Sequence, residues 1–255
     1  MGGTKHDGKK KPKDGKKKPG RGLLVALALL LVLAAAFFGY TAVYYHADAT
    51  ALAALGSDAT VRVSRTAYGW LFDGPSETDA LIFYPGGKVE ATAYAPLLRQ
   101  IAAGDMDVCL VEMPFRLAVL AGDKADEALA AHDYANWYIG GHSLGGAMAA
   151  NYAAAHGDAL RGLVLLGAYA TRPLDGDLQA ISIWGSEDGV VNRDQLAAGR
   201  QYLPADAVYC EIPGGDHAQF GSYGPQRGDG TPRISPEEQW AETAALIREL
   251  PDRAA

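Results

Sequence analysis

The sequence predicts an α/β fold, in which a mainly parallel twisted sheet carries helices on both faces and follows one transmembrane helix. Short apolar runs recur after about residue 60, and segments with helical spacing separate them. Strands that alternate with helices favour βαβ units, and therefore a parallel sheet. A long uncharged run near the start of the chain predicts the membrane helix.

The first 21 residues differ in composition from the rest of the chain. They hold eight lysines and Arg21 against two aspartates, a net charge of +7. Because the whole chain has a net charge of −7, the other 234 residues carry −14. The segment is rich in Lys, Gly and Pro and contains no apolar run, so it cannot bury enough surface to fold. We expect residues 1–21 to form a disordered, basic, cytoplasmic tail.

An uncharged stretch runs from Leu23 to Tyr45. As a helix it would be about 35 Å long at ~1.5 Å per residue, enough to cross the hydrocarbon core. A cleaved signal peptide has a shorter apolar region; cleavage and a buried core helix are the alternatives to an anchor. We predict a signal anchor over residues 22–45, with the basic tail in the cytoplasm, the tyrosines at the opposite interface and the remaining chain outside the membrane.

A lysine-rich run can also bind nucleic acid. Beside a membrane helix, however, topology and contact with anionic lipid account for the lysines. The acidic remainder gives no support for a nucleic-acid partner.

The two cysteines, Cys109 and Cys210, could pair in an oxidising compartment. Because both lie in apolar, strand-like stretches, we expect two free thiols instead.

A linker over residues 46–59 is expected to lead into a single domain over 60–255. An opening pair of alternating runs within 60–74 predicts an antiparallel hairpin at the edge of the sheet. Near-continuous apolar runs, typical of strands buried on both faces, follow at 80–87, 107–114, 135–143, 160–170, 178–188 and 207–217. Helical spacing marks the segments 89–104, 123–133, 145–157 and 193–204.

The last helix has explicit start and stop signals. Ser235 is the expected N-cap, Pro236 the first helical residue, and Glu238 completes a capping box three residues after the cap. Pro251 follows the expected end of the helix.

Ser143 is the candidate nucleophile. It lies in Gly141-His142-Ser143-Leu144-Gly145, between an apolar run and a helical segment. A strained strand-to-helix turn can present a serine to substrate, but it leaves almost no room for side chains at Gly141 and Gly145. An ordinary glycine turn is the alternative.

A serine nucleophile needs a base, and His217 is the candidate because it follows a predicted strand in a turn-rich loop. The other five histidines lie in the tail, beside the membrane, near helix ends or, for His142, next to the serine, where the side chain should point elsewhere. We expect His217 to reach over the carboxyl edge of the sheet.

An acid must orient that imidazole. We predict Asp188, in the loop after the next-to-last strand, since Glu187 is one residue nearer the strand and should face away. Asp175 and Asp177 are the alternatives, whereas Asp216 is expected to be solvated or to form a turn.

The oxyanion of a tetrahedral intermediate needs amide donors. The backbone N–H of Leu144, the residue after the serine, is the first candidate. The second should come from the loop "PGGK" after the strand "LIFY", where Gly87 is the preferred donor and Lys88 the next.

These motifs together resemble the α/β-hydrolase superfamily. "GGHSLGG" is similar to its nucleophile elbow, "GSEDGVV" to its acid loop and "GGDHAQFG" to its histidine loop, in the same chain order and over residues 60–250. Within the superfamily the chain looks most like the compact bacterial branch related to dienelactone hydrolases, although Ser143 stands where dienelactone hydrolase has a cysteine. About ten residues separate the strands near 165 and 181, too few for the large helical cap of many members.

The resemblance implies acyl transfer through an acyl-enzyme, with no metal and no organic cofactor. We therefore expect a membrane-anchored serine hydrolase that acts on carboxylic esters. An acyltransferase that uses a lipid or cell-wall alcohol, and a non-catalytic binding module, are the alternatives. An open site would favour small or extended esters, unless the loop over 219–238 covers it.

Overall fold

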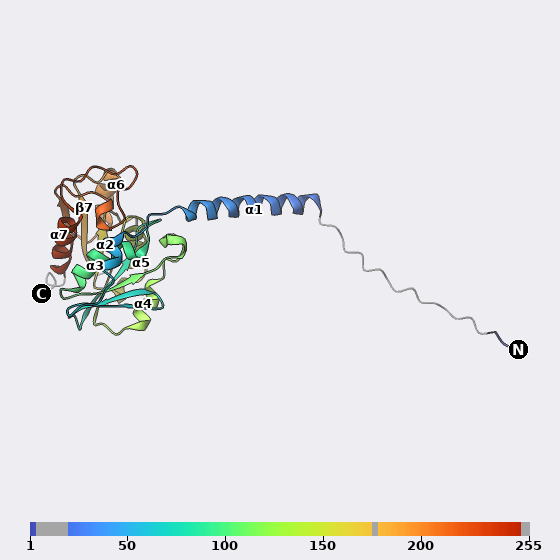
Figure 1. Cartoon of the computed structure of the whole chain (residues 1–255), viewed down its shortest axis with the longest axis horizontal. Helices are drawn as coiled ribbons and strands as arrows, with labels where there is room; N and C mark the ends of the chain where they lie inside the picture. The colour runs from blue at the N-terminus through green and yellow to red at the C-terminus, as the bar shows by residue number, and fades with distance from the viewer. Residues whose placement is uncertain (4–19, 175–177, 251–255) are drawn as a thin grey trace. The chain divides into compact units, whose positions relative to one another are not determined.

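The computed structural model describes residues 1–3, 20–174 and 178–250 (Figure 1). Two compact units divide the chain, Met1–Ala42 and Val43–Ala255. Most of the predicted basic tail lies outside the described residues.

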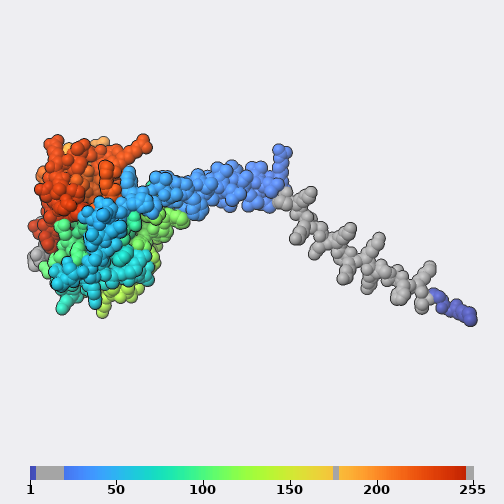
Figure 2. Space-filling model, in the orientation of Figure 1, coloured from blue at the N-terminus to red at the C-terminus, as the bar shows by residue number. Residues whose placement is uncertain are grey.

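In the first unit, helix α1 runs over Arg21–Ala42. It is long and apolar enough to cross a membrane by length and composition. Its large apolar side chains are exposed along the helix, with values of 60–69% from Leu29 to Leu33 (Figure 2). The helix ends at Ala42, three residues before Tyr45, the expected end of the anchor. Tyr45 already belongs to the second unit, where its backbone pairs with Lys88 and Glu90.

The second unit is built on a single eight-stranded sheet with the order β1-β2-β4-β3-β5-β6-β7-β8. The strands are β1 Arg62–Arg65, β2 Gly69–Asp73, β3 Asp79–Tyr84, β4 Asp107–Val111, β5 Asn136–His142, β6 Gly162–Leu166, β7 Gln179–Gly185 and β8 Val208–Ile212. Strands β3 to β8 form a parallel sheet. Strand β2 pairs with β4 in the antiparallel direction, and β1 pairs with β2 at the edge. The predicted hairpin and the predicted parallel sheet are both confirmed.

Helices cover both faces of this sheet (Figure 1). Helices α3 Ala95–Ala102 and α7 Pro236–Arg248 pack on one face, in a core that includes Leu81 and Phe83 of β3. Helices α4 Ala125–Ala131 and α5 Leu144–Ala155 pack on the other, in a core that includes Ile82. Neighbouring residues of β3 thus serve opposite cores, because side chains alternate along a strand. Each fully buried Leu, Ile or Phe stabilises the fold by roughly 1.5–3 kcal/mol, which explains the continuous apolar runs.

The start of α7 carries the predicted capping box. The hydroxyl of Ser235 accepts a hydrogen bond from the Glu238 amide at 3.2 Å, and the Glu238 carboxylate accepts one from the Ser235 amide at 2.8 Å. Pro236 is the first helical residue, as predicted. Pro251 lies outside the described residues.

The segment expected to be a linker is instead part of the domain. We call residues 43–48 the exit segment. The Tyr45 amide donates to the Lys88 carbonyl at 2.8 Å, and the Tyr45 carbonyl accepts from the Glu90 amide at 2.9 Å. Asp48 then caps the short helix α2, Ala49–Ala53. The prediction of a linker over 46–59 is therefore corrected: backbone pairing and capping fix this stretch to the domain.

The exit segment also contacts the loop that follows β8. The Asp48 amide donates to the Ser222 carbonyl at 3.0 Å, and the Ser222 hydroxyl donates to the Asp48 carboxylate at 2.8 Å. In the space-filling view, blue residues of this part of the chain lie on the surface against orange residues of that loop (Figure 2). One segment thus joins two loops at the carboxyl edge of the sheet.

The β6–β7 connection spans residues 167–178, so it has no room for a large cap. Of these residues, 175–177 are not described. Cys109 is buried and Cys210 half-buried, and the two do not form a disulfide, as predicted.

Candidate active site

Ser143 lies between the end of β5 and the start of α5, at the carboxyl edge of the sheet. Its backbone has φ 53° and ψ −123°, a conformation that side-chain-bearing residues rarely adopt. Cβ atoms built at Gly141 and Gly145 would lie 2.5 Å and 2.2 Å from the Tyr84 carbonyl oxygen. Only glycine therefore fits at these two positions, which is the close packing expected around a presented serine.

His217 and Asp188 form a buried pair. His217 follows β8, and its Nδ1 lies 2.8 Å from Oδ2 of Asp188, with the imidazole 1% exposed. The other carboxylate oxygen accepts the amides of Val190 and Val191 at 2.9 and 2.8 Å. The carboxylate is thus held by two amides and accepts a hydrogen bond from the N–H at Nδ1 of His217. Nε2 has no hydrogen-bond partner within the described chain, so it can serve as a proton acceptor.

Ser143 and His217 line the same cavity, which has a volume of about 460 Å³. The fold therefore brings the three predicted residues together: the serine and the histidine at one cavity, and the aspartate behind the histidine. The other lining residues are Leu144, Ala147, Met148, Asn151, Gly167, Ala168, Tyr169, Thr171, Val190, Val191 and Asn192.

Two amides are available beside the serine. Leu144 is the first residue of α5, where an N–H has no intrahelical partner. Gly87 faces it: a Cβ atom at Gly87 would lie 2.8 Å from Cδ2 of Leu144. Neither amide donates a hydrogen bond within the described residues.

The second-choice donor, Lys88, needs a correction. Its N–H donates to the Arg116 carbonyl at 2.8 Å, so this amide is already engaged. Its backbone is left-handed, with φ 59°. Gly87 is therefore the amide of this loop that remains for an oxyanion.

The other acidic candidates lie elsewhere. Glu187 pairs with Arg233 at 3.2 Å, and so faces away from His217, as expected. Asp216 forms a turn by accepting the Gln219 amide at 2.8 Å, but it is buried rather than solvated, and burial raises its pKa to about 6. Residues 175 and 177, the remaining alternatives, are outside the described residues.

His142 contacts the site, contrary to expectation. Its ring centroid is 4.3 Å from that of His217, and its Nδ1 lies 2.7 Å from the Tyr94 hydroxyl. Burial, together with repulsion from His217, lowers the pKa of His142 well below its usual value of 6.5. Sequence spacing could not reveal this contact, because Tyr94 and His217 come from distant parts of the chain.

Asp229 is a second residue that the sequence did not point to. Its carboxylate accepts amides from Gly189 at 3.0 Å, His217 at 3.3 Å and Ala218 at 2.8 Å. One side chain thus joins the loop of the candidate acid to the loop of the candidate base. An aspartate between glycines in a long loop carries no signal for this role.

The loop over 219–238 surrounds a different cavity, of about 280 Å³, together with Asp48 and Asp216. No residue of this loop is among the described residues that line the cavity at Ser143.

The comparisons with known proteins agree with this geometry at the level of the fold. A membrane phospholipase A, described as a bacterial virulence factor, superposes with a TM-score of 0.59 at 14% identity, over 91% of this chain and 100% of that one. Dienelactone hydrolase from Anabaena variabilis gives a TM-score of 0.54 at 13% identity, over 76% and 98%. The esterase domain of a Rhodothermus marinus protein gives 0.52 at 14% identity, over 76% and 98%. Comparison with curated protein sequences gave no match.

The predicted relation to dienelactone hydrolases is confirmed as a likeness of fold. A family model described as the alpha/beta hydrolase family matches residues 80–241, which include Ser143, Asp188 and His217. The chain belongs to the α/β-hydrolase family.

Proposed function

We propose that this α/β hydrolase is a membrane-anchored serine hydrolase that cleaves carboxylic esters. One observation carries the proposal: a buried Asp188–His217 pair lies behind a cavity that is also lined by Ser143. A serine in a strained turn, a histidine with an unpartnered Nε2 and a fixed carboxylate are the parts that acyl transfer requires.

In this mechanism His217 Nε2 takes the proton from the Ser143 hydroxyl as its oxygen attacks the ester carbonyl. Asp188 stays ionised and stabilises the imidazolium through Nδ1. The amides of Leu144 and Gly87 donate to the oxyanion, and each such donor can lower the barrier by roughly 3 kcal/mol. His217 returns the proton to the leaving alcohol, and an acyl-enzyme remains. Water, deprotonated by the same imidazole, then releases the acid.

The cavity supports an acyl group as the bound part of the substrate. Apolar side chains from two elements line it, Ala147 and Met148 of α5 and Val190 and Val191 after β7. Its volume of about 460 Å³ suits a small or extended acyl group. Similarity of fold to an esterase domain and to a phospholipase is compatible with an ester substrate.

The anchor is helix α1, which meets the length and composition of a membrane span. The lysine-rich tail before it favours a cytoplasmic N-terminus, so the catalytic domain lies on the other side of the membrane. An epitope tag at the N-terminus should survive protease added to intact cells, while the domain is digested. Release of the full chain from membranes by alkaline washing would contradict the anchor.

The chemistry is tested with a fluorophosphonate probe and a series of aryl esters. The full chain should react with the probe and hydrolyse the esters, and Ser143→Ala should do neither while unfolding at the same urea concentration. A folded wild-type chain that fails to react would support a binding module instead. Transfer of the acyl group to an added alcohol, in preference to water, would identify an acyltransferase.

A further inference from the structure

A short turn after β4 exposes an unusual amount of apolar surface. Two single 3-10 turns, Pro114–Arg116 and Ala118–Leu120, make up what we call the apolar turn, residues 114–120. Phe115, Val119 and Leu120 are 43%, 55% and 48% exposed. Among the described residues of the second unit, the only other exposed large apolar side chains are Val43 and Leu52. Single exposed apolar residues are ordinary, but three within six residues indicate a contact surface.

The apolar turn is joined to the point where the chain leaves α1. The guanidinium of Arg116 lies over the ring of Tyr44, 3.3 Å from its centroid. Tyr44 is two residues beyond Ala42, the last residue of α1. Two residues of extended chain span at most about 7 Å. At whatever angle α1 leaves, a bilayer that it crosses up to its last residue therefore reaches to within about that distance of Tyr44.

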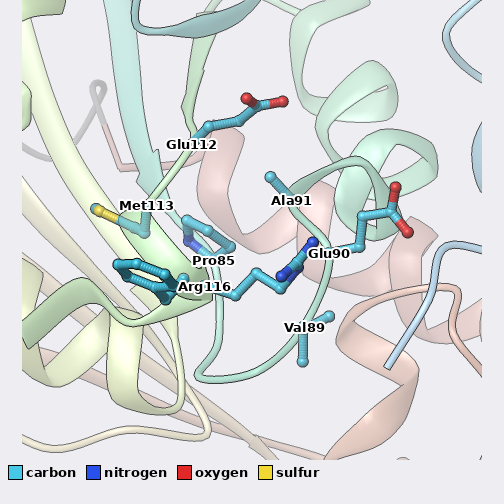
Figure 3. Close-up of a pocket in the computed structure, with 8 residues that line it drawn as sticks. Pro85, Val89, Glu90, Ala91, Glu112, Met113 and Arg116 are labelled. Atoms are coloured by element: carbon cyan, nitrogen blue, oxygen red, sulfur yellow. The ribbon is translucent and has the colours of Figure 1, made fainter. Parts of the chain in front are cut away.

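The same turn is joined to the loop that carries Gly87. The Arg116 carbonyl accepts a hydrogen bond from the Lys88 amide. The Arg116 side chain extends across a pocket of about 270 Å³ toward Glu90 (Figure 3). Pro85 and Val89 line this pocket too, so its walls come from both loops. The apolar turn, the exit segment and the loop of the candidate oxyanion donor therefore form one connected surface.

The chemistry of this surface matches a lipid interface. Apolar side chains favour the acyl boundary, while tyrosine and arginine favour the headgroup level. The backbone of the turn is left-handed at both Phe115 and Arg116, with φ 52° and 60°. Such a pair of non-glycine residues persists only where the surroundings hold it.

We propose that the apolar turn is a second membrane contact, in which Phe115, Val119 and Leu120 enter the phospholipid bilayer beside the anchor. This inference rests on the anchor of the proposed function. It adds that the Gly87 loop is held at the lipid surface, so that the site takes acyl esters from the bilayer as well as from water.

Spin labels test the contact directly. The full chain, with Cys210→Ser to remove a half-buried thiol, is reconstituted into phosphatidylcholine vesicles with a single label at Leu120→Cys, Leu30→Cys or Ala159→Cys. Leu30 reports on the anchor, and Ala159 is an exposed residue just before β6, at the opposite edge of the sheet. We expect the labels at 30 and 120 to be more accessible to oxygen than to a water-soluble nickel chelate, and the label at 159 to show the reverse.

The outcomes separate the two proposals. If position 30 lies in the bilayer and position 120 behaves like 159, the second contact is overturned and the anchor stands. If position 120 is shielded from both reagents and shows spin–spin broadening, a second copy of the chain covers the turn, which also overturns the proposal. If position 30 is exposed to the chelate, the anchor fails and the second contact fails with it.

Activity provides an independent test. The double variant Val119→Ser/Leu120→Ser should hydrolyse a vesicle-borne ester roughly threefold or more slowly, because apolar contact with the interface is lost. Its rate on a water-soluble aryl ester should stay within about twofold of the wild type, since neither residue lines the cavity at Ser143. The control Val119→Ile/Leu120→Ile keeps the apolar surface and should behave like the wild type. Equal loss on both esters would contradict a membrane role.

Discussion

The imidazole of His142 lies 4.3 Å from that of His217, centroid to centroid, and within the described residues only His217 has a carboxylate partner. A charge on both rings would be costly at this distance, and burial already disfavours it on His142. His142 therefore stays neutral in the folded protein. Its Tyr94 partner holds the ring in place without supplying a negative charge.

The first prediction concerns stability at mildly acidic pH. The unfolded chain protonates His142 near pH 6.5, whereas the lowered pKa keeps it neutral in the fold. The unfolded state then binds more protons, so the free energy of unfolding should fall below pH 6.5 by up to about 1.4 kcal/mol per pH unit. Urea unfolding between pH 7.5 and 5.5 measures this slope.

The variant His142→Gln isolates that contribution, since it should show a shallower dependence over the same range. Asp216 acts in the opposite sense, because its pKa is raised to about 6 and the stability it contributes is lost as the pH rises from about 4 through 6. Asp216 is present in both proteins, so its effect cancels in the comparison. Identical slopes would refute the neutral-histidine account.

The second prediction concerns the acid. Asp188→Asn should lower kcat on the order of 10³–10⁴-fold, because an amide can donate to Nδ1 and so place the histidine proton on Nε2. The matched control is Glu187→Gln, whose carboxylate pairs with Arg233 instead, and it should keep most of its activity. Steady-state rates on an aryl ester decide between the two. Comparable losses in both variants would remove Asp188 from the proposed role.

The third prediction concerns the Tyr94 hydroxyl, which accepts the Gly86 amide at 3.0 Å and contacts His142. Tyr94→Phe leaves both groups without this partner and should cost roughly 1–3 kcal/mol of unfolding free energy. Because Gly86 precedes the candidate oxyanion donor, kcat should fall as well, with little change in KM.

Tyr84 offers a control for Tyr94. Its hydroxyl also makes two hydrogen bonds, to the Gly122 carbonyl and from the Ala125 amide, but these are with the segment around the start of α4. Tyr84→Phe should lower stability to a similar degree without a matching loss of kcat. A parallel loss of kcat in both variants would mean that Tyr94 acts through stability alone.

The fourth prediction concerns acyl-chain length. Met148 lines the cavity at Ser143 and also a neighbouring cavity of about 250 Å³, so it lies between the two. Met148→Ala should connect them and shift the preferred aryl ester to a longer acyl chain, whereas Met148→Leu conserves volume and should not. A profile of kcat/KM against chain length measures the shift. An unchanged profile in the alanine variant would show that substrate does not reach this residue.

The sequence predicted the strands and helices well because their burial follows a local pattern. The continuous apolar runs exist because both faces of β4 and β6 are covered, and the capping signals at Ser235 act within three residues. The loops that carry the candidate serine, acid and base could be predicted as well. Parallel strands place their carboxyl ends at one edge of the sheet, so loops that follow such strands lie close together.

The remaining features depend on contacts that no local pattern encodes. The amide of Lys88 is engaged by Arg116 from a separate loop, and Asp229 reaches back to amides that lie 11 to 40 residues earlier. The pairing of Tyr45 with the Gly87 loop joins the end of an apolar run to a turn more than 40 residues away. In each case the partner is determined by tertiary packing, so spacing within one segment could not identify it.

The exit segment also determines where a water-soluble fragment of this protein can begin. A fragment cut at residue 60, where the strand pattern starts, would lose Tyr45, Asp48 and α2, and with them the hydrogen bonds to Lys88, Glu90 and Ser222. A fragment cut between Ala42 and Val43 would remove all of α1 and keep every one of these bonds. For expression and crystallisation, the useful boundary therefore lies at the last residue of the apolar helix.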